Sequence, residues 1–194
     1  MNDRPILFSA PMVQALLAGR KTQTRRKVTP HIEVDHIGHL HSSIKLRISV
    51  GDRLYVREHW RTTYGLDWTV EDLGRPLRPV EFDPKTTPIE YLADGENELG
   101  GKDRRAMHMP RWASRLTLTV TDVRVERLQS ISEADALAEG LAGVELDGMD
   151  PRGWYRNLWE SINGPGSWEA NPWVAAYTFR VIKQNIDQIE RAAA

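Results

Sequence analysis

The fold is decided by the stretch RLTLTVTDVRVERL, residues 115–128, in which apolar and polar side chains alternate. Alternation with a period of two is typical of a β-strand that buries one face. The phase of the alternation shifts by one position at Thr121–Asp122, which predicts a β-bulge where the strand bends. The apolar members of this long strand are Leu116, Leu118, Val120, Val123 and Val125.

Shorter elements flank this strand. The sequence SISEADALAEG, directly after it, predicts a helix with Ser132 as N-cap and Gly140 as the residue that ends it. Apolar side chains at helical spacing predict a second helix over 152–163, and Pro11 and Gly19 suit the start and the end of a third. We expect strands at 6–10, within 51–60 and at 173–182, an irregular segment at 31–43 and a polar helix from Lys183.

The order of these elements is not the regular alternation of strand and helix that builds a doubly wound sheet. It predicts an α+β fold, a small mixed β-barrel with helices on its rim. Between 61 and 108, prolines and acidic residues interrupt any regular element, which predicts one long irregular insertion. We therefore expect a single domain at 1–183, with 61–108 as the insertion and 184–194 as a C-terminal tail.

The composition narrows the class of protein. The 194 residues carry 26 Lys and Arg against 27 Asp and Glu, so any attraction for nucleic acid must come from local clusters of charge. The absence of cysteine excludes disulfides, cysteine-ligated zinc ribbons, iron–sulfur clusters and thiol nucleophiles. No stretch approaches the roughly 18 apolar residues that a membrane span needs. We therefore expect a cytoplasmic protein with no membrane partner.

A basic cluster follows the first helix, in the stretch LLAGRKTQTRRKV at 16–28. Arg25, Arg26 and Lys27, with Arg20 before them, are candidates to bind the phosphates of RNA or DNA, and such contacts would make binding depend on salt. If this segment is a strand, Arg25 and Lys27 face one side and Arg26 the other, so only a subset can touch one ligand. The alternative is a solvated basic loop that binds nothing.

Three further side chains are candidates for a ligand site. Glu58 ends a strand beside an aromatic residue, and the alternative for it is a salt bridge with Arg57 or Arg61. Trp112 lies between two arginines, where it would either stack on a base or cap the barrel. Trp173 stands in the NPW motif at the entrance of the last strand, where it would lie near the ligand.

Four potential metal ligands occur close together, at Asp35, His36, His39 and His41. Catalytic zinc sites usually take their ligands from more than one ordered element, and this spacing matches no defined site. We therefore expect no metal. The sequence also lacks a serine triad, a Gly-rich phosphate loop and a dinucleotide fingerprint, so no cofactor is expected.

Four motifs form a joint signature: GRKTQTRR after the first helix, GDRLYVRE on the next strand, LQSISEADALAEG opening a helix, and NPWVAAYTF near the end. Together they resemble the ASCH domain family, a relative of the PUA-like barrels of RNA-modifying proteins. The run from HMPRWASR to ALAEG, with LWESINGPGSW, is similar to the longer ASCH-containing proteins of phages and prophages. The resemblance covers nearly the whole chain apart from the insertion and the tail, and it implies a PUA-like mixed β-barrel.

The resemblance also implies a ligand, namely RNA or a modified cytidine nucleoside. Small bacterial members that resemble this chain hydrolyse the amide of N4-acetylcytidine. They use a lysine and a threonine from a G-x-K-x-x-T motif and a glutamate from a later helix, which correspond here to Lys21, Thr24 and Glu139 as catalytic residues. The small enzymes lack a counterpart of 61–108, and another family member is similar to a ribonuclease in activity, so the chemistry does not follow from the fold.

Three functions therefore stay open: an amidohydrolase that removes N4-acyl groups from cytidine, a non-catalytic RNA- or DNA-binding module, and a ribonuclease. For the amidohydrolase two divisions of the work are possible. In one, Lys21 as a neutral amine activates Thr24 or a water molecule while Glu139 moves the proton. In the other, Glu139 is the base and the charged Lys21 stabilises the oxyanion. The oligomeric state is left open as well.

Overall fold

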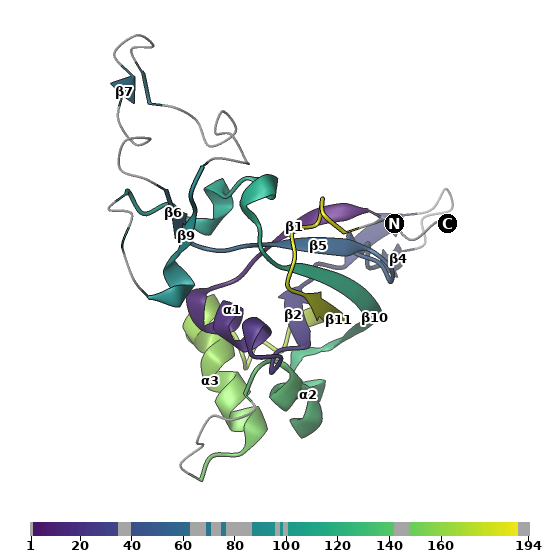
Figure 1. Ribbon diagram of the computed structural model, residues 1–194. Coiled ribbons are helices and arrows are strands. Elements are labelled where there is room, and N and C mark those ends of the chain that lie inside the picture. The colour runs from purple at the N-terminus through teal and green to yellow at the C-terminus, as the bar shows by residue number, and fades with distance from the viewer. Residues whose placement is uncertain are drawn as a thin grey trace. The chain divides into compact units, whose positions relative to one another are not determined.

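The computed structural model describes residues 2–34, 40–62, 69–70, 75–76, 87–95, 98, 101–141 and 148–189 (Figure 1). The predicted α+β class is confirmed. The strands are β1 (Asp3–Leu7), β2 (Gln23–Lys27), β3 (His31–Val34), β4 (Leu40–Ser43), β5 (Arg53–Arg57), β6 (Trp60–Arg61), β7 (Thr69–Val70), β8 (Arg75–Pro76), β9 (Glu90–Tyr91), β10 (Thr117–Arg127) and β11 (Trp173–Ile182). The α-helices are α1 (Ala10–Leu17), α2 (Glu133–Ala138) and α3 (Pro151–Asn163), and 3-10 turns lie at Leu92–Asp94, Ala106–His108, Arg111–Ala113 and Leu128–Ser130.

Five strands form the main sheet, in the order β1-β5-β10-β11-β2. The sheet is mixed, because β1 pairs with β5 in parallel whereas β5 with β10 and β11 with β2 are antiparallel. Among the strands described, β1 and β2 are the edges, so the sheet agrees with a PUA-like α+β fold but is not closed into a barrel. The long strand predicted from the alternation is confirmed as β10, and the bulge at Thr121–Asp122 stays a prediction.

Two compact units divide the chain, and β10 and β11 contribute to both. Unit 1 comprises residues 19–52 and 120–180. In this unit α2 and α3 pack against each other (Figure 1), and their apolar side chains meet Val174 of β11 in a buried core. The buried members of this core are Leu128, Ile131, Ala136, Tyr155, Trp159, Trp168 and Val174.

Local signals explain where α2 and α3 begin and end. The Ser132 hydroxyl accepts a hydrogen bond from the Asp135 amide, as predicted for an N-cap, and Gly140 takes a positive φ of 116° directly after the helix. Asp150 caps α3 in the same way through the amide of Gly153. Tyr155 and Trp159 are four residues apart, so both aromatic rings lie on the buried face of α3.

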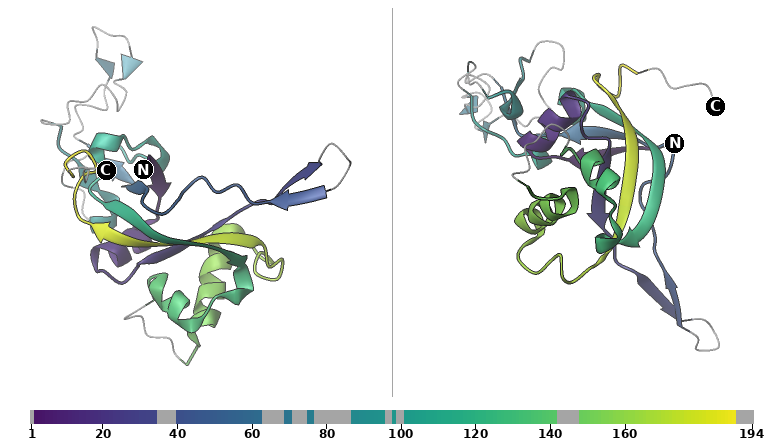
Figure 2. Two further views of the ribbon diagram at one scale, coloured as in Figure 1. Left: turned by 90° about the vertical axis from the view of Figure 1, so that its right-hand side faces the viewer. Right: turned by 90° about the horizontal axis from the view of Figure 1, so that it is seen from below.

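The segment 31–43, expected to be irregular, contains a hairpin, so that expectation is wrong for the strands described. β3 pairs with β4 in antiparallel register (Figure 2, where the hairpin extends away from β2 and β11). Each strand has only four residues, which is too short for a periodicity to stand out in the sequence.

Unit 2 comprises residues 2–18 and 53–119 with the segment after Arg180. Here β1 pairs with β5 over five residues, and α1 packs against the turn Leu92–Asp94, where Gln14 Nε2 donates to the Ala93 carbonyl at 2.6 Å. A second core consists of Trp60, Met109 and Ala113, with Ile89, Tyr91 and Trp112 packed against it.

Part of the expected insertion at 61–108 is therefore built into this second core. Trp60 and Arg104 exchange two backbone hydrogen bonds, of 3.1 and 2.8 Å, and β6 pairs with β9. These contacts order the described residues 87–95 and 101–108. Of the rest of the insertion, the structure describes only 61–62, the short strands β7 and β8, and residue 98.

The first strand and the C-terminal segment differ in detail from the prediction. β1 begins at Asp3 and ends at Leu7, and α1 already starts at Ala10. Residues 183–189 form bends and turns in place of the polar helix expected there. Within the described part of the chain, no helix is both long and apolar enough to cross a membrane.

Candidate functional site

A buried ion pair joins the two sequence segments that make up unit 1. Lys21 Nζ donates to Glu139 Oε2 at 2.7 Å and to the Glu139 carbonyl at 2.9 Å. The two side chains are 0% and 3% exposed. The main chain supports the contact, because Lys21 and Glu139 form an antiparallel β-bridge and the Thr22 amide donates to the Ala138 carbonyl at 2.8 Å. The C-terminal end of α2 is thus fixed to the residues that lead into β2.

Arg25 completes the surroundings of Glu139. Its Nη1 donates to Glu139 Oε1 at 3.2 Å, and its Nη2 lies 2.8 Å from Glu126 Oε1 and 3.1 Å from Asp135 Oδ2. Its guanidinium also lies 5.8 Å from the centroid of the Tyr155 ring. Both oxygens of Glu139 therefore accept charge-assisted hydrogen bonds.

Burial lowers the pKa of Lys21, because an ammonium is poorly stabilised away from water. The charge and the hydrogen bond of Glu139 raise this pKa and so oppose the effect of burial. The neighbouring charges of Arg26 and Arg25 add to the effect of burial. Lys21 therefore gives up its proton more readily than an exposed lysine, while Glu139 fixes the position of its Nζ.

Thr24, which the family resemblance matches to a catalytic threonine, is also buried, with 2% of its surface exposed. It stands opposite Tyr177 in the β2–β11 ladder, so the two side chains share a face of the sheet. Gln23 and Arg25, its neighbours on β2, turn to α2, where both contact acidic side chains. Alternation therefore places Thr24 and Arg26 on the face of Tyr177, whereas Lys21 contacts α2.

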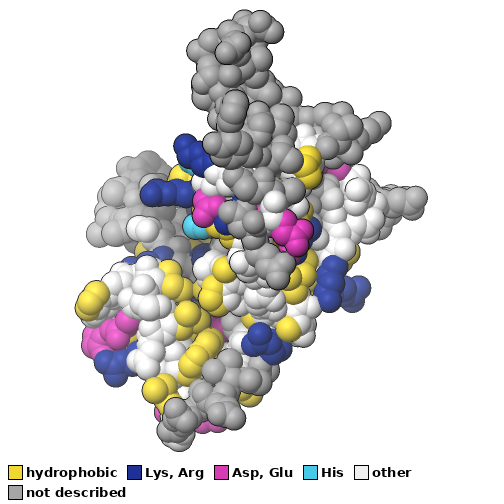
Figure 3. All heavy atoms as spheres, turned by 60° about the vertical axis from the view of Figure 1, so that its left-hand side comes forward, with side chains coloured by type: hydrophobic (Ala, Val, Ile, Leu, Met, Phe, Trp, Pro, Cys, Tyr) yellow, Lys and Arg dark blue, Asp and Glu magenta, His cyan; other side chains and the backbone are white. Residues whose placement is uncertain are grey.

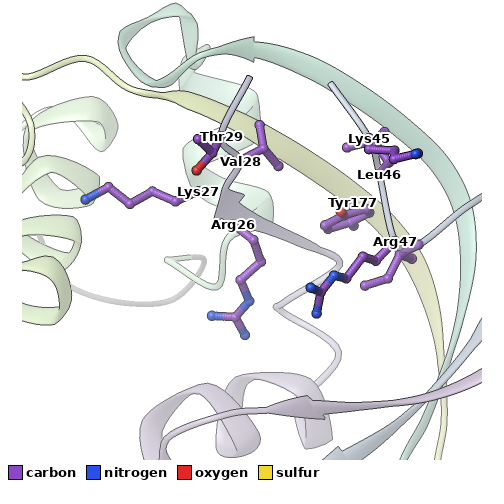
Figure 4. Close-up of a pocket in the computed structure, with 9 residues that line it drawn as sticks. Arg26, Lys27, Val28, Thr29, Lys45, Leu46, Arg47 and Tyr177 are labelled. Atoms are coloured by element: carbon purple, nitrogen blue, oxygen red, sulfur yellow. The ribbon is translucent and has the colours of Figure 1, made fainter. Parts of the chain in front are cut away.

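A pocket of about 440 Å³ opens beside that face (Figure 4). The segment 45–48 lies along one side of it and the end of β2 along the other, with the Tyr177 ring between them (Figure 4). None of the nine described residues that line it is acidic. They are Arg26, Lys27, Val28, Thr29, Lys45, Leu46, Arg47, Ile48 and Tyr177.

Of these lining residues, only Arg26 and Lys27 were predicted from the sequence to bind a ligand. The sequence-based prediction did not include Lys45, Arg47 and Tyr177. A signal was present for the first two, because KLRI at 45–48 alternates cations with apolar residues, the pattern of an extended segment with one charged side. No local signal marks Tyr177, whose position depends on the register of β11 against β2.

Other predicted residues of unit 1 have different partners. Arg20 Nη1 donates to the Gly140 carbonyl at 3.0 Å, just beyond the buried pair. Trp173 is half-buried, and the Arg127 guanidinium lies 4.4 Å from the centroid of its ring. Arg25 binds carboxylates of the protein where a phosphate was expected, which leaves Arg26 and Lys27 as the members of the basic cluster that reach the pocket.

Glu58 and Trp112 belong to unit 2. Glu58 is 1% exposed and pairs with Arg115 at 2.9 Å, whereas the alternative to a ligand site was a salt bridge with Arg57 or Arg61. Burial raises the pKa of Glu58, and the hydrogen bond from Arg115 opposes this rise. Trp112 packs against the core around Trp60, which agrees with the capping alternative and not with an exposed stacking surface.

The potential metal ligands cannot be placed in the same way. Asp35, His36 and His39 lie outside the described residues, and of His41 only the backbone is described. Elsewhere, in the part of the chain that the structure describes, no group of three or more His, Asp or Glu side chains is arranged to hold a metal ion.

No family model and no curated protein matches the chain. Among solved structures, the chain is similar to the protein EF3133 from Enterococcus faecalis V583, of family DUF984, with 11% identity over 98% of this chain and 86% of that one. The TM-score is 0.43, so the likeness carries no argument about function.

Proposed function

We propose that this chain is an ASCH-type hydrolase that removes the N4-acyl group from a cytidine. The observation that carries the proposal is the contact of Lys21 Nζ with Glu139 Oε2 at 2.7 Å, between residues that the family motif pairs as catalytic. The two residues are 118 positions apart in the chain, and each is buried. A buried lysine of lowered pKa beside a carboxylate is an arrangement found at many catalytic sites.

The geometry favours Lys21 over Glu139 as the general base. Both oxygens of Glu139 already accept hydrogen bonds, from Lys21 and from Arg25, so Glu139 is poorly placed to take a proton from water. Lys21 is the better base, because burial lowers its pKa and makes the neutral amine accessible. Glu139 and Arg25 are then positioning residues that hold the Lys21 side chain.

The reaction follows from these roles. The Lys21 amine takes a proton from a water molecule as the water oxygen bonds to the acyl carbon, which forms the tetrahedral oxyanion. Thr24 lies on the other face of β2 and takes no part in this step. The resulting Lys21 ammonium gives the proton to the exocyclic N4 as the carbon–nitrogen bond breaks. Cytidine and the free carboxylic acid leave. Because Lys21 has no exposed surface, the acyl group reaches it only when the site opens.

The test is incubation with N4-acetylcytidine and chromatographic detection of cytidine. We expect turnover by the wild-type chain and a loss of at least about 100-fold in kcat/KM for Lys21→Met, as is typical when an acid–base group is removed. Lys183→Met is the matched control, because Lys183 is exposed. Near-UV circular dichroism confirms that each variant is folded. Absence of turnover, or equal turnover by Lys21→Met and Lys183→Met, would refute the catalytic role.

A second candidate is a non-catalytic nucleic-acid-binding module, favoured by the four cations that line the pocket. It predicts that oligoribonucleotides bind in a salt-dependent manner and emerge chemically unchanged. The same incubation with end-labelled RNA separates the functions: a released acyl group identifies the hydrolase, shortened RNA a ribonuclease, and intact RNA with salt-dependent binding the binding module.

A further inference from the structure

We infer that the pocket between β2 and the segment 45–48 binds a phosphate group of the substrate. The inference rests on the proposed function and specifies its substrate class: the acylated cytidine is recognised as a nucleotide, either free or within RNA, and not as a nucleoside. The first support is the positive charge of the residues that line the pocket. Four of the nine lining residues are cations and none of the nine is acidic.

The second support is the direction of two side chains. Figure 4 shows the Arg47 side chain extending toward the side of Tyr177 on which the Arg26 guanidinium ends, whereas the amines of Lys27 and Lys45 point outward in opposite directions. Both guanidinium groups carry a positive charge, which attracts an anion to the pocket. The planar guanidinium group fits the oxygens of a phosphate.

The third support is the size and the remaining lining of the pocket. About 440 Å³ falls within the range of roughly 300–1,000 Å³ that is usual for small-molecule sites. Val28, Leu46 and Ile48 supply apolar surface for a sugar or a base next to the cations. The pocket can therefore hold more of a nucleotide than its phosphate.

The fourth support connects the pocket with the proposed catalytic residues. Arg26 lines the pocket. Burial lowers the pKa of Arg26 and the charge of the Glu139 carboxylate opposes this fall, so the two charges lie within electrostatic range. Thr24 shares the face of β2 and β11 on which Arg26 and Tyr177 lie. The pocket therefore lies on the Thr24 face of β2, and Arg26 connects it electrostatically with Glu139.

The distribution of charge elsewhere indicates a local site. Among the described side chains on the face shown in Figure 3, lysines and arginines are separated by hydrophobic and uncharged surface. The formal net charge of the chain is −1. A pocket that neutralises one or two phosphates fits these features better than a long electrostatic track along a nucleic acid.

The experiment compares binding of cytidine, cytidine 5′-monophosphate and a short cytidine-containing oligoribonucleotide by isothermal titration calorimetry. We expect the monophosphate to bind at least about tenfold more tightly than the nucleoside, as for a charge-assisted contact. Arg47→Ala should abolish this preference. Arg180→Ala is the matched control, because Arg180 is an exposed arginine on β11 that does not line the pocket, and it should retain the preference.

The ligands carry no acyl group, so the binding result stands whether or not the chain hydrolyses N4-acetylcytidine. Tighter binding of the oligoribonucleotide than of the monophosphate would identify RNA as the source of the phosphate, and equal binding would identify a free nucleotide. Equal affinity for nucleoside and monophosphate, no measurable binding of either, or a preference that survives in Arg47→Ala would each overturn the inference.

Discussion

Replacing Glu139 by glutamine tests whether the buried pair is charged. In Glu139→Gln, the fully buried Lys21 ammonium loses its carboxylate, while Arg25 keeps Glu126 and Asp135. Removal of one partner of a buried ion pair typically costs about 3–5 kcal/mol, because the other charge stays uncompensated. For a chain of 150–250 residues this corresponds to a fall of roughly 6–20 °C in Tm.

The double variant Lys21→Met/Glu139→Gln sharpens this prediction. It removes the uncompensated ammonium together with its partner, so we expect it to be more stable than Glu139→Gln alone. The assay is urea unfolding at neutral pH, followed by tryptophan fluorescence and far-UV circular dichroism, with the exposed Glu133→Gln as control. A loss below about 1 kcal/mol in Glu139→Gln, which is the range of an exposed pair, would refute the reasoning, as would a double variant no more stable than the single one.

Three further predictions concern stability. The folded-state pKa of Lys21 is lowered from 10.5, so between these two pKa values the native chain binds fewer protons than the unfolded one. The stability of the wild type relative to Lys21→Met should therefore rise with pH in this window, and urea unfolding at several pH values checks the slope. Burial raises the pKa of Asp135, but hydrogen bonds from Arg124 and Gln23 prevail and lower it to about 2. The stabilisation is therefore present above pH 3.8 and lost as the pH falls toward 2, and an acid-unfolding curve of Asp135→Asn should lack this loss. Trp159→Ala empties a core position that is 4% exposed and should cost about 3–5 kcal/mol, measured from the urea midpoint.

The elements that the sequence predicts well are those with a strong local signal. β10 follows from the alternation of Leu116, Leu118 and Val120, whose side chains are buried in the structure. The start of α2 follows from Ser132, whose hydroxyl makes the capping hydrogen bond. In each case the stabilising interaction lies within a few residues of the signal, so the sequence alone contains it.

The candidate site was less accessible to such reasoning. The pairing of Lys21 with Glu139 was expected only from the family resemblance, because no periodicity relates residues 118 positions apart. For Glu58, the alternative to a ligand site was a salt bridge with a neighbour in sequence, but its partner Arg115 is 57 positions away. The pocket depends on the register of β11 against β2 and on the path of 45–48, both of which are set by tertiary packing.

The late pairing of β2 has a consequence for synthesis on the ribosome. β2 is complete at Lys27, but its ladder partner β11 begins at Trp173 and the carboxylates of α2 appear only after Glu133. For most of translation, the nascent chain therefore carries an edge strand without partners, the kind of segment that recruits other chains into aggregates. Lys21, Arg25 and Arg26 keep that strand hydrated and repel its copies on neighbouring ribosomes until the carboxylates that enclose two of these cations have been made.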